Sequence, residues 1–141
     1  MSHEYSVSAT VQPESLVALS AVGLPGIESG PPKEFGGSGE QWSPEDLLIG
    51  AVADCFVLSF KAIAAASKYA WVDLNCDVTG TLDKVERAMQ FTELKIKATL
   101  KISADADADR AKRLLEKAEQ TCFITNSLKA EPELEIDIQT V

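Results

Sequence analysis

A long apolar segment with a marked start is the feature that most constrains how this chain folds. Between Leu47 and Ala66 only Asp54 and Lys61 carry a charge. The residues in front of the segment form a helix start: Ser43 as N-cap, Pro44 as the first helical residue, and Glu45 and Asp46 in the first turn. A helix that is apolar on almost all sides is surrounded by protein. We therefore expect a central helix from about Leu47 to Ala66.

The same segment is long enough to raise the question of a membrane span. A charged side chain near a bilayer centre costs about 2.5 to 3.5 kcal/mol, and the segment contains two of them. The N-terminus lacks the basic and apolar regions of a signal peptide. We expect a cytoplasmic protein with no membrane contact, and one chain of 141 residues supplies little cover for such a helix.

Alternation of apolar and polar residues predicts strands on both sides of the central helix. The expected strands are 5–11 and 16–22 in a hairpin, 71–82 and 91–102 joined by a polar connection over 83–90, and a last strand around 134–138. The glycines and prolines between Gly23 and Gly39 predict irregular structure. A second helix is expected over Ala106 to Cys122. This order predicts an α+β fold in a single domain, 1–141, with helices packed on antiparallel sheet.

Charge and composition exclude several classes of function. The formal net charge of −9 is repelled by phosphate backbones, so no nucleic acid partner is expected. His3 is the only histidine, which leaves no residue for a histidine base or a histidine metal site. The glycines at 36, 37 and 39 lack the spacing of a dinucleotide or phosphate loop. We therefore expect neither a metal nor a cofactor.

Cysteines are the remaining candidates for chemistry. Three cysteines are an odd number, which fits a reducing compartment better than a secreted disulfide scaffold. Cys55 and Cys122 occupy apolar positions of the two predicted helices, and Cys76 is expected to be a core residue of a strand. Two interpretations of Cys55 and Cys122 stay open: buried small hydrophobes, or a pair that cycles between dithiol and disulfide.

Two carboxylates of the central helix complete the candidate set. Glu45 lies ten residues before Cys55, or roughly 15 Å along one helix, so the two share a site only if Glu45 comes from a second copy. Asp54 lies inside the apolar segment and is expected to pair with Lys61, which is on the same face.

The segment 31–55 resembles the signature of the OsmC/Ohr family, the osmotically inducible and organic hydroperoxide resistance proteins. It reads PPKEFGGSGEQWSPEDLLIGAVADC, with a glycine loop, Ser-Pro-Glu at a helix start and a cysteine ten residues after the glutamate. The sequence CFITNSL from Cys122 matches the place of the family's second thiol. The resemblance implies an intertwined homodimer, with antiparallel sheets wrapping two central helices and active sites at the interface.

The resemblance also implies a thiol peroxidase that acts on organic hydroperoxides. By position, Cys55 matches the peroxidatic cysteine, Cys122 the resolving cysteine, and Glu45 the glutamate that pairs with a catalytic arginine. An unidentified thiol reductant would return the resulting disulfide to the dithiol. The alternative is a member that binds a hydrophobic small molecule or senses redox state without peroxidase activity, and a third possibility is a structural dimer.

The chain departs from this family pattern at the arginine. Family peroxidases carry it near the N-terminal hairpin, whereas the first arginine here is Arg87. Burial raises the pKa of a thiol, so a buried thiolate needs a stabilising group. Lys33 and Arg87 are the two candidate substitutes. Phe123 also stands where family peroxidases usually have proline.

Overall fold

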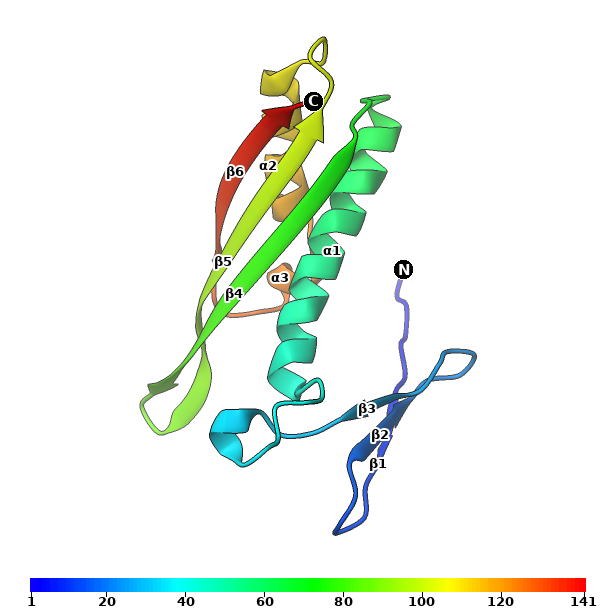
Figure 1. Cartoon of the computed structure of the whole chain (residues 1–141), viewed down its shortest axis with the longest axis vertical. Helices are drawn as coiled ribbons and strands as arrows, with labels where there is room; N and C mark the ends of the chain where they lie inside the picture. Colours follow the sequence, from blue (N-terminus) through cyan, green and yellow to red (C-terminus); the bar gives the residue numbers. More distant parts are fainter. The chain divides into compact units, whose positions relative to one another are not determined.

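The computed structural model describes all residues, 1–141, and the chain divides into two compact units, residues 1–48 and 49–141. Its helices and strands alternate in the order expected for an α+β protein. Figure 1 shows the elements along the chain. The prediction of the α+β class is confirmed.

The first unit contains a small antiparallel sheet. Its strands are β1 (Ser8–Thr10), β2 (Val17–Ser20) and β3 (Ile27–Ser29), in the order β1-β2-β3. The predicted hairpin is present with shorter strands, but the prediction of irregular structure after Gly23 is wrong for β3. Gly23 adopts a φ of 78°, which closes the turn that brings Ile27 opposite Leu19. The glycine therefore allows this strand to pair.

The glycine loop forms a short 3-10 helix, η1 (Lys33–Phe35), with tight turns after it. Gly36 has a φ of 94° and its N–H donates to the carbonyl of Lys33. At Gly37 a side chain would collide with the carbonyl oxygen of Pro31. These glycines are required by backbone geometry, as expected for a shaped connection.

Helix α1 (Pro44–Ala66) begins where the sequence predicts. The Ser43 hydroxyl accepts the Asp46 N–H at 3.0 Å, and the Asp46 carboxylate accepts the Ser43 N–H at 3.1 Å. This reciprocal capping satisfies two backbone donors that the first turn leaves free. The cap explains why the boundary is readable from sequence.

The second unit contains a three-stranded sheet in the order β4-β5-β6. Its strands are β4 (Asp73–Val85), β5 (Ala88–Ile102) and β6 (Pro132–Thr140). β4 and β5 form one long hairpin whose turn is only Glu86 and Arg87. The predicted polar connection over 83–90 is therefore mostly strand, because Glu86 takes a φ of 58° and closes a two-residue turn.

One strand pairing differs from the antiparallel arrangement that we expected. β6 runs parallel to β5, with Ile96 opposite Leu134 and Ala98 opposite Ile136. Helix α2 (Ala108–Gln120) and the one-turn helix α3 (Phe123–Asn126) lie between these strands in the chain. The helical crossover carries the chain from the end of β5 back to the edge of the sheet where β5 began, so the next strand is parallel. The sheet is consequently mixed.

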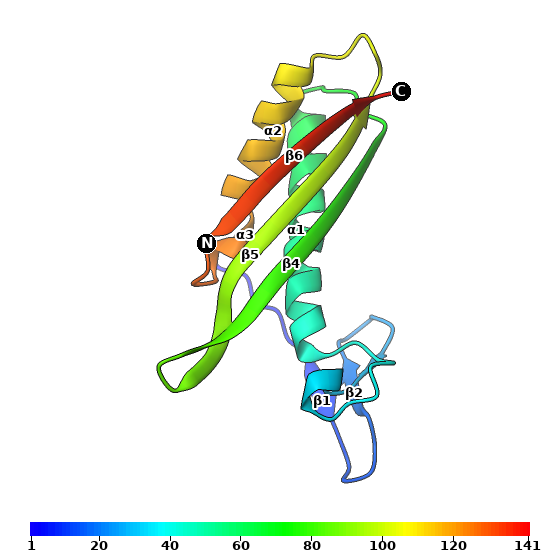
Figure 2. The ribbon, with the colours of Figure 1, turned by 60° about the vertical axis from the view of Figure 1, so that its left-hand side comes forward.

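The core lies between this sheet and helices α1 and α2, which cover the same face of it in Figures 1 and 2. From α1 the core takes one stripe with a spacing of four: Val52, Phe56, Phe60 and Ala64, all fully buried. β5 and α2 supply the facing layers, Ile96, Ala98, Leu100, Ile102, Ala111, Leu115 and Ala118. This buried stripe occupies only one side of α1, although α1 is apolar on most sides.

The rest of α1 is only partly covered within the chain. Leu58 is 57% exposed, and α1 is the one helix long and apolar enough to cross a membrane by length and composition. The sequence predicted that one chain would not cover this helix, and the burial pattern confirms that point.

Candidate active site

Cys55 lies half-buried in the middle of α1, and Cys122 is buried just before α3. α2 ends at Gln120, so the prediction that the second helix continues to Cys122 is wrong. The chain turns out of α2 at Thr121, and Cys122 takes extended backbone as the N-cap of α3. Both cysteines are free thiols, and each affects the pKa of the other.

The surroundings of Cys55 favour its thiolate. Burial by itself would raise the pKa of Cys55, but hydrogen bonding outweighs burial and the pKa is lowered. The Cys122 thiol and the backbone N–H of Ile124 contribute most, followed by the Ser59 hydroxyl and the N–H of Phe123. The Ser59 Oγ lies 3.9 Å from the Cys55 Sγ. Cys55 therefore has more thiolate character than an ordinary buried cysteine.

Cys122 has the opposite tendency. Burial and its bond to Cys55 raise its pKa, although Thr125 works in the other direction. A thiol that stays protonated beside a thiolate donates its S–H to the charged sulfur. The surroundings therefore favour the thiolate at Cys55 and the protonated thiol at Cys122.

An apolar pocket of about 540 Å³ opens beside Cys55. Its wall comes from α1 and from the segment around α3, and it comprises Ala51, Asp54, Cys55, Leu58, Ser59, Ala62, Ile63, Thr121, Phe123 and Ile124. Phe123, which departs from the family's usual proline, is 81% exposed at this wall. A small molecule with an apolar substituent fits such a surface.

Glu45 also carries an unusual feature. Its Oε1 atom is buried and has no hydrogen-bond partner within the chain. A buried carboxylate oxygen without a partner costs free energy. The Oε1 atom of Glu45 can therefore accept a hydrogen bond from a group outside this chain.

No cation contributes to the lowered pKa of Cys55. The groups that act on its sulfur are another thiol, a hydroxyl and two backbone N–H groups. Lys33 lies exposed in η1, and Arg87 lies exposed in the β4–β5 turn. The expectation that one of them replaces the family arginine stays a prediction.

Asp54 is exposed on α1, so the premise that it is buried and needs a charged partner is wrong. Lys61 is exposed as well, and each side chain is solvated where the chain places it. Asp54 instead contributes to the pocket wall beside Cys55.

Cys76 lies on β4 and packs against the core, as its strand pattern predicts. Burial, the neighbouring Asp77 and Cys122 raise its pKa to about 11. A thiol with such a pKa is almost fully protonated near neutral pH. Cys76 therefore has the character of an inert core residue.

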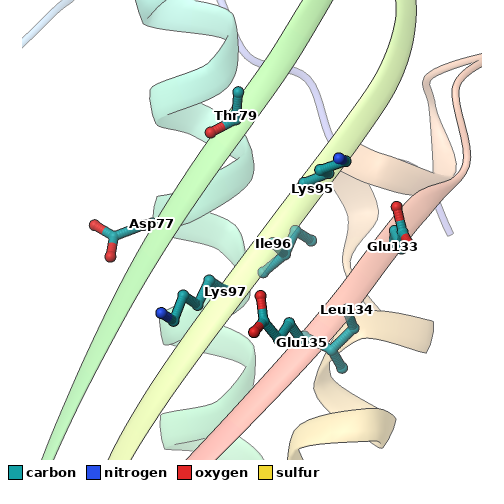
Figure 3. A pocket seen from close by; sticks show the side chains of 8 residues that line it. All are labelled: Asp77, Thr79, Lys95, Ile96, Lys97, Glu133, Leu134 and Glu135. Atoms are coloured by element: carbon teal, nitrogen blue, oxygen red, sulfur yellow. The ribbon is translucent and has the colours of Figure 1, made fainter.

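A second hollow, of about 530 Å³, lies on the open face of the β4-β5-β6 sheet (Figure 3). Its side chains form rows of alternating charge across the strands, with Lys97 between Asp77 and Glu135, and Lys95 beside Glu133. Opposite charges on neighbouring strands stabilise a sheet. Because opposite charges face one another across these strands and no cysteine lines the hollow, we assign it to sheet stability.

Comparison with known proteins agrees with this geometry. The model of the family described as OsmC-like protein matches residues 37–137. This chain belongs to the OsmC-like protein family. The resemblance inferred from the sequence is confirmed.

Three similar proteins illustrate the range of this family. "Peroxiredoxin OsmC" of Escherichia coli is 24% identical over 98 residues, covering 70% of this chain and 68% of that protein. The uncharacterized protein YmaD of Bacillus subtilis is 27% identical over 109 residues, covering 75% and 73%. An OsmC-like protein of unknown function from Vibrio cholerae shares the fold, with a TM-score of 0.87, 20% identity and coverage of 96% and 99%.

Sequence reasoning missed part of the site. Ser59 stands four residues after Cys55, which places both on one face of the helix. This spacing could have identified Ser59 as part of the candidate site. The N–H groups of Phe123 and Ile124 carry no residue-specific signal. They act on Cys55 only because the chain leaves α2 before Cys122.

Proposed function

We propose that this protein is a thiol peroxidase that reduces organic hydroperoxides to alcohols. The single observation that carries the proposal is the Cys55 sulfur, which has a lowered pKa, interacts with a second thiol and lines an apolar pocket. The similarity to a peroxiredoxin in Escherichia coli supports it. The pocket wall favours hydroperoxides with an apolar substituent over hydrogen peroxide.

In the first step the Cys55 thiolate attacks the terminal oxygen of the hydroperoxide. The O–O bond breaks, an S–O bond forms, and the alkoxide takes a proton from water to leave as the alcohol. Cys55 is thereby oxidised to a sulfenic acid. The donors around the sulfur keep it ionised before the attack, which is the form that reacts.

In the second step Cys122 attacks the sulfur of the sulfenic acid. An S–S bond forms, and the hydroxyl leaves as water with the proton of the Cys122 thiol. A dithiol reductant of unidentified nature then reduces the disulfide by thiol exchange. Each thiol affects the pKa of the other, which supports this pairing.

The working form in this proposal is a cytoplasmic homodimer. Each chain exposes apolar side chains on its first unit, such as Leu24 and Ile27, and Leu58 on α1. A second copy would bury such residues and would offer a donor to the orphaned Oε1 of Glu45. In this arrangement Glu45 of one copy completes the site of the other, as the family resemblance implies. Each chain forms one domain.

A direct test is hydroperoxide consumption with dithiothreitol as the reductant. The parent protein should consume cumene hydroperoxide faster than hydrogen peroxide. Cys55→Ser should abolish the reaction, and Cys122→Ser should leave a sulfenic acid at Cys55 that dimedone traps. Cys76→Ser is the matched control and should retain the activity.

The second candidate function is binding of an apolar small molecule without chemistry. The observation that favours it is the pocket itself, whose wall is largely apolar. If neither hydroperoxide oxidised Cys55 while an apolar ligand protected its thiol from alkylation, the binding function would replace the peroxidase.

A further inference from the structure

The pocket beside Cys55 is apolar except for one charged side chain. Asp54 is the one acidic residue of its wall, to which Ser59 and Thr121 add hydroxyl groups. No lysine or arginine faces the same space. On this wall an anionic substrate therefore meets a like charge and no counter-ion.

We propose that Asp54 makes this site selective for uncharged apolar hydroperoxides, and that it discriminates against hydroperoxides that carry a carboxylate. The inference rests on the proposed peroxidase function and deepens it by naming the substrate class. Asp54 acts as a specificity-determining residue, since it neighbours Cys55 in the chain and contributes to the same wall.

The size of the effect follows from simple electrostatics. Two negative charges about 7 Å apart, in surroundings between bulk water and a protein surface, repel one another enough to slow a reaction roughly threefold to eightfold. The repulsion is screened by salt, because the Debye length falls to about 3 Å at 1 M ionic strength. A role of Asp54 in folding alone would produce neither the charge dependence nor the salt dependence.

The experiment compares two matched probes, cumene hydroperoxide with a para-carboxylate and the methyl ester of the same compound. The rate of Cys55 oxidation is measured for each at low salt and at 1 M salt. The parent should favour the ester, and Asp54→Asn should reduce the ester-to-acid rate ratio by roughly threefold to eightfold. High salt should reduce the ratio more in the parent than in the variant.

Asp73→Asn is the matched control. It changes the net charge equally, is exposed on β4 and does not line the pocket, so its rate ratio should equal that of the parent. An ester-to-acid ratio that Asp54→Asn leaves unchanged, or a parent ratio that ignores salt, overturns the inference.

A second measurement separates this inference from the peroxidase proposal. The alcohols corresponding to the two probes are tested for protection of Cys55 against iodoacetamide, which needs no peroxidase chemistry. If no hydroperoxide reacts but the ester alcohol protects better than the acid alcohol, the peroxidase is lost and the charge selectivity stands. Equal protection, or none from either alcohol, overturns the selectivity.

Discussion

Replacement of Ser59 by alanine tests how the Cys55 thiolate is stabilised without an arginine at the sulfur. Ser59 and Cys55 stand one helical turn apart on α1, with 3.9 Å between Oγ and Sγ. The hydroxyl helps to lower the pKa of Cys55. Its removal should therefore raise that pKa and reduce the thiolate fraction at neutral pH.

The magnitude follows from the geometry of this contact. A hydrogen bond to a charged group contributes about 1.5 to 3 kcal/mol, but the distance here is long and Cys55 is only half-buried. We therefore use about 0.5 to 1 kcal/mol, in the range of an ordinary hydrogen bond. This free energy corresponds to a twofold to fivefold lower rate of reaction below the pKa, at about 1.4 kcal/mol for each factor of ten.

The assay is the rate of iodoacetamide alkylation at Cys55 from pH 5 to 10, followed by peptide mass so that Cys76 and Cys122 are counted separately. Alkylation by the thiolate rises with pH and levels off above the pKa. In Ser59→Ala the curve should shift to higher pH, while Ser59→Thr, which keeps a hydroxyl, should lie near the parent.

Ser67→Ala is the matched control, because Ser67 follows the end of α1 and its hydrogen bonds to Ile63 and Arg110 use only its backbone. An unchanged curve in Ser59→Ala would refute the role of the hydroxyl. A shift of the same size in Ser59→Thr and Ser59→Ala would show that packing, and not the hydroxyl, sets the pKa.

Three further predictions concern the rest of the chain. Cys76→Ala should retain hydroperoxide consumption, and Cys76 should resist iodoacetamide at pH 8 because its pKa is about 11; fast labelling at Cys76 would contradict the assignment. Lys97→Glu should lower the free energy of unfolding in urea by about 1 to 2 kcal/mol, because it places a third carboxylate between Asp77 and Glu135. Lys129 is exposed, and Lys129→Glu should change this free energy little. Equal effects of the two substitutions would argue against the charge rows. Sedimentation at micromolar concentration should show a dimer that buries on the order of 2,000 Å², and a folded, stable monomer would remove the shared site.

Local signals in the sequence predicted the parts of the fold that depend on local interactions. The start of α1 is an example, because its cap is formed by Ser43 and Asp46 within one turn. The inward side of β4 and β5 is another, since alternation alone places Leu74 and Leu100 against the core.

The errors occurred where a few residues act through geometry that the pattern does not express. The two-residue turn at Glu86 and Arg87 extends both strands into a segment that reads as polar. The parallel β6 depends on the path taken by α2, which no local pattern encodes.

The candidate site shows the same division. Cys55 and Cys122 were predictable from their positions and from the family resemblance. The N–H groups of Phe123 and Ile124 were not, because any residue supplies an N–H and only the break between α2 and α3 directs these two to the sulfur. A sequence search for charged partners could therefore not predict the lowered pKa of Cys55.

The most direct test of the central claim is the identity of the bond formed by one equivalent of cumene hydroperoxide. Reduced protein is mixed with the hydroperoxide, remaining thiols are blocked, and peptides are mapped by mass without reduction. The account predicts that two of the three thiols are lost per chain and that the product is a Cys55–Cys122 disulfide within one chain. Three intact thiols, or a disulfide that contains Cys76, would contradict it.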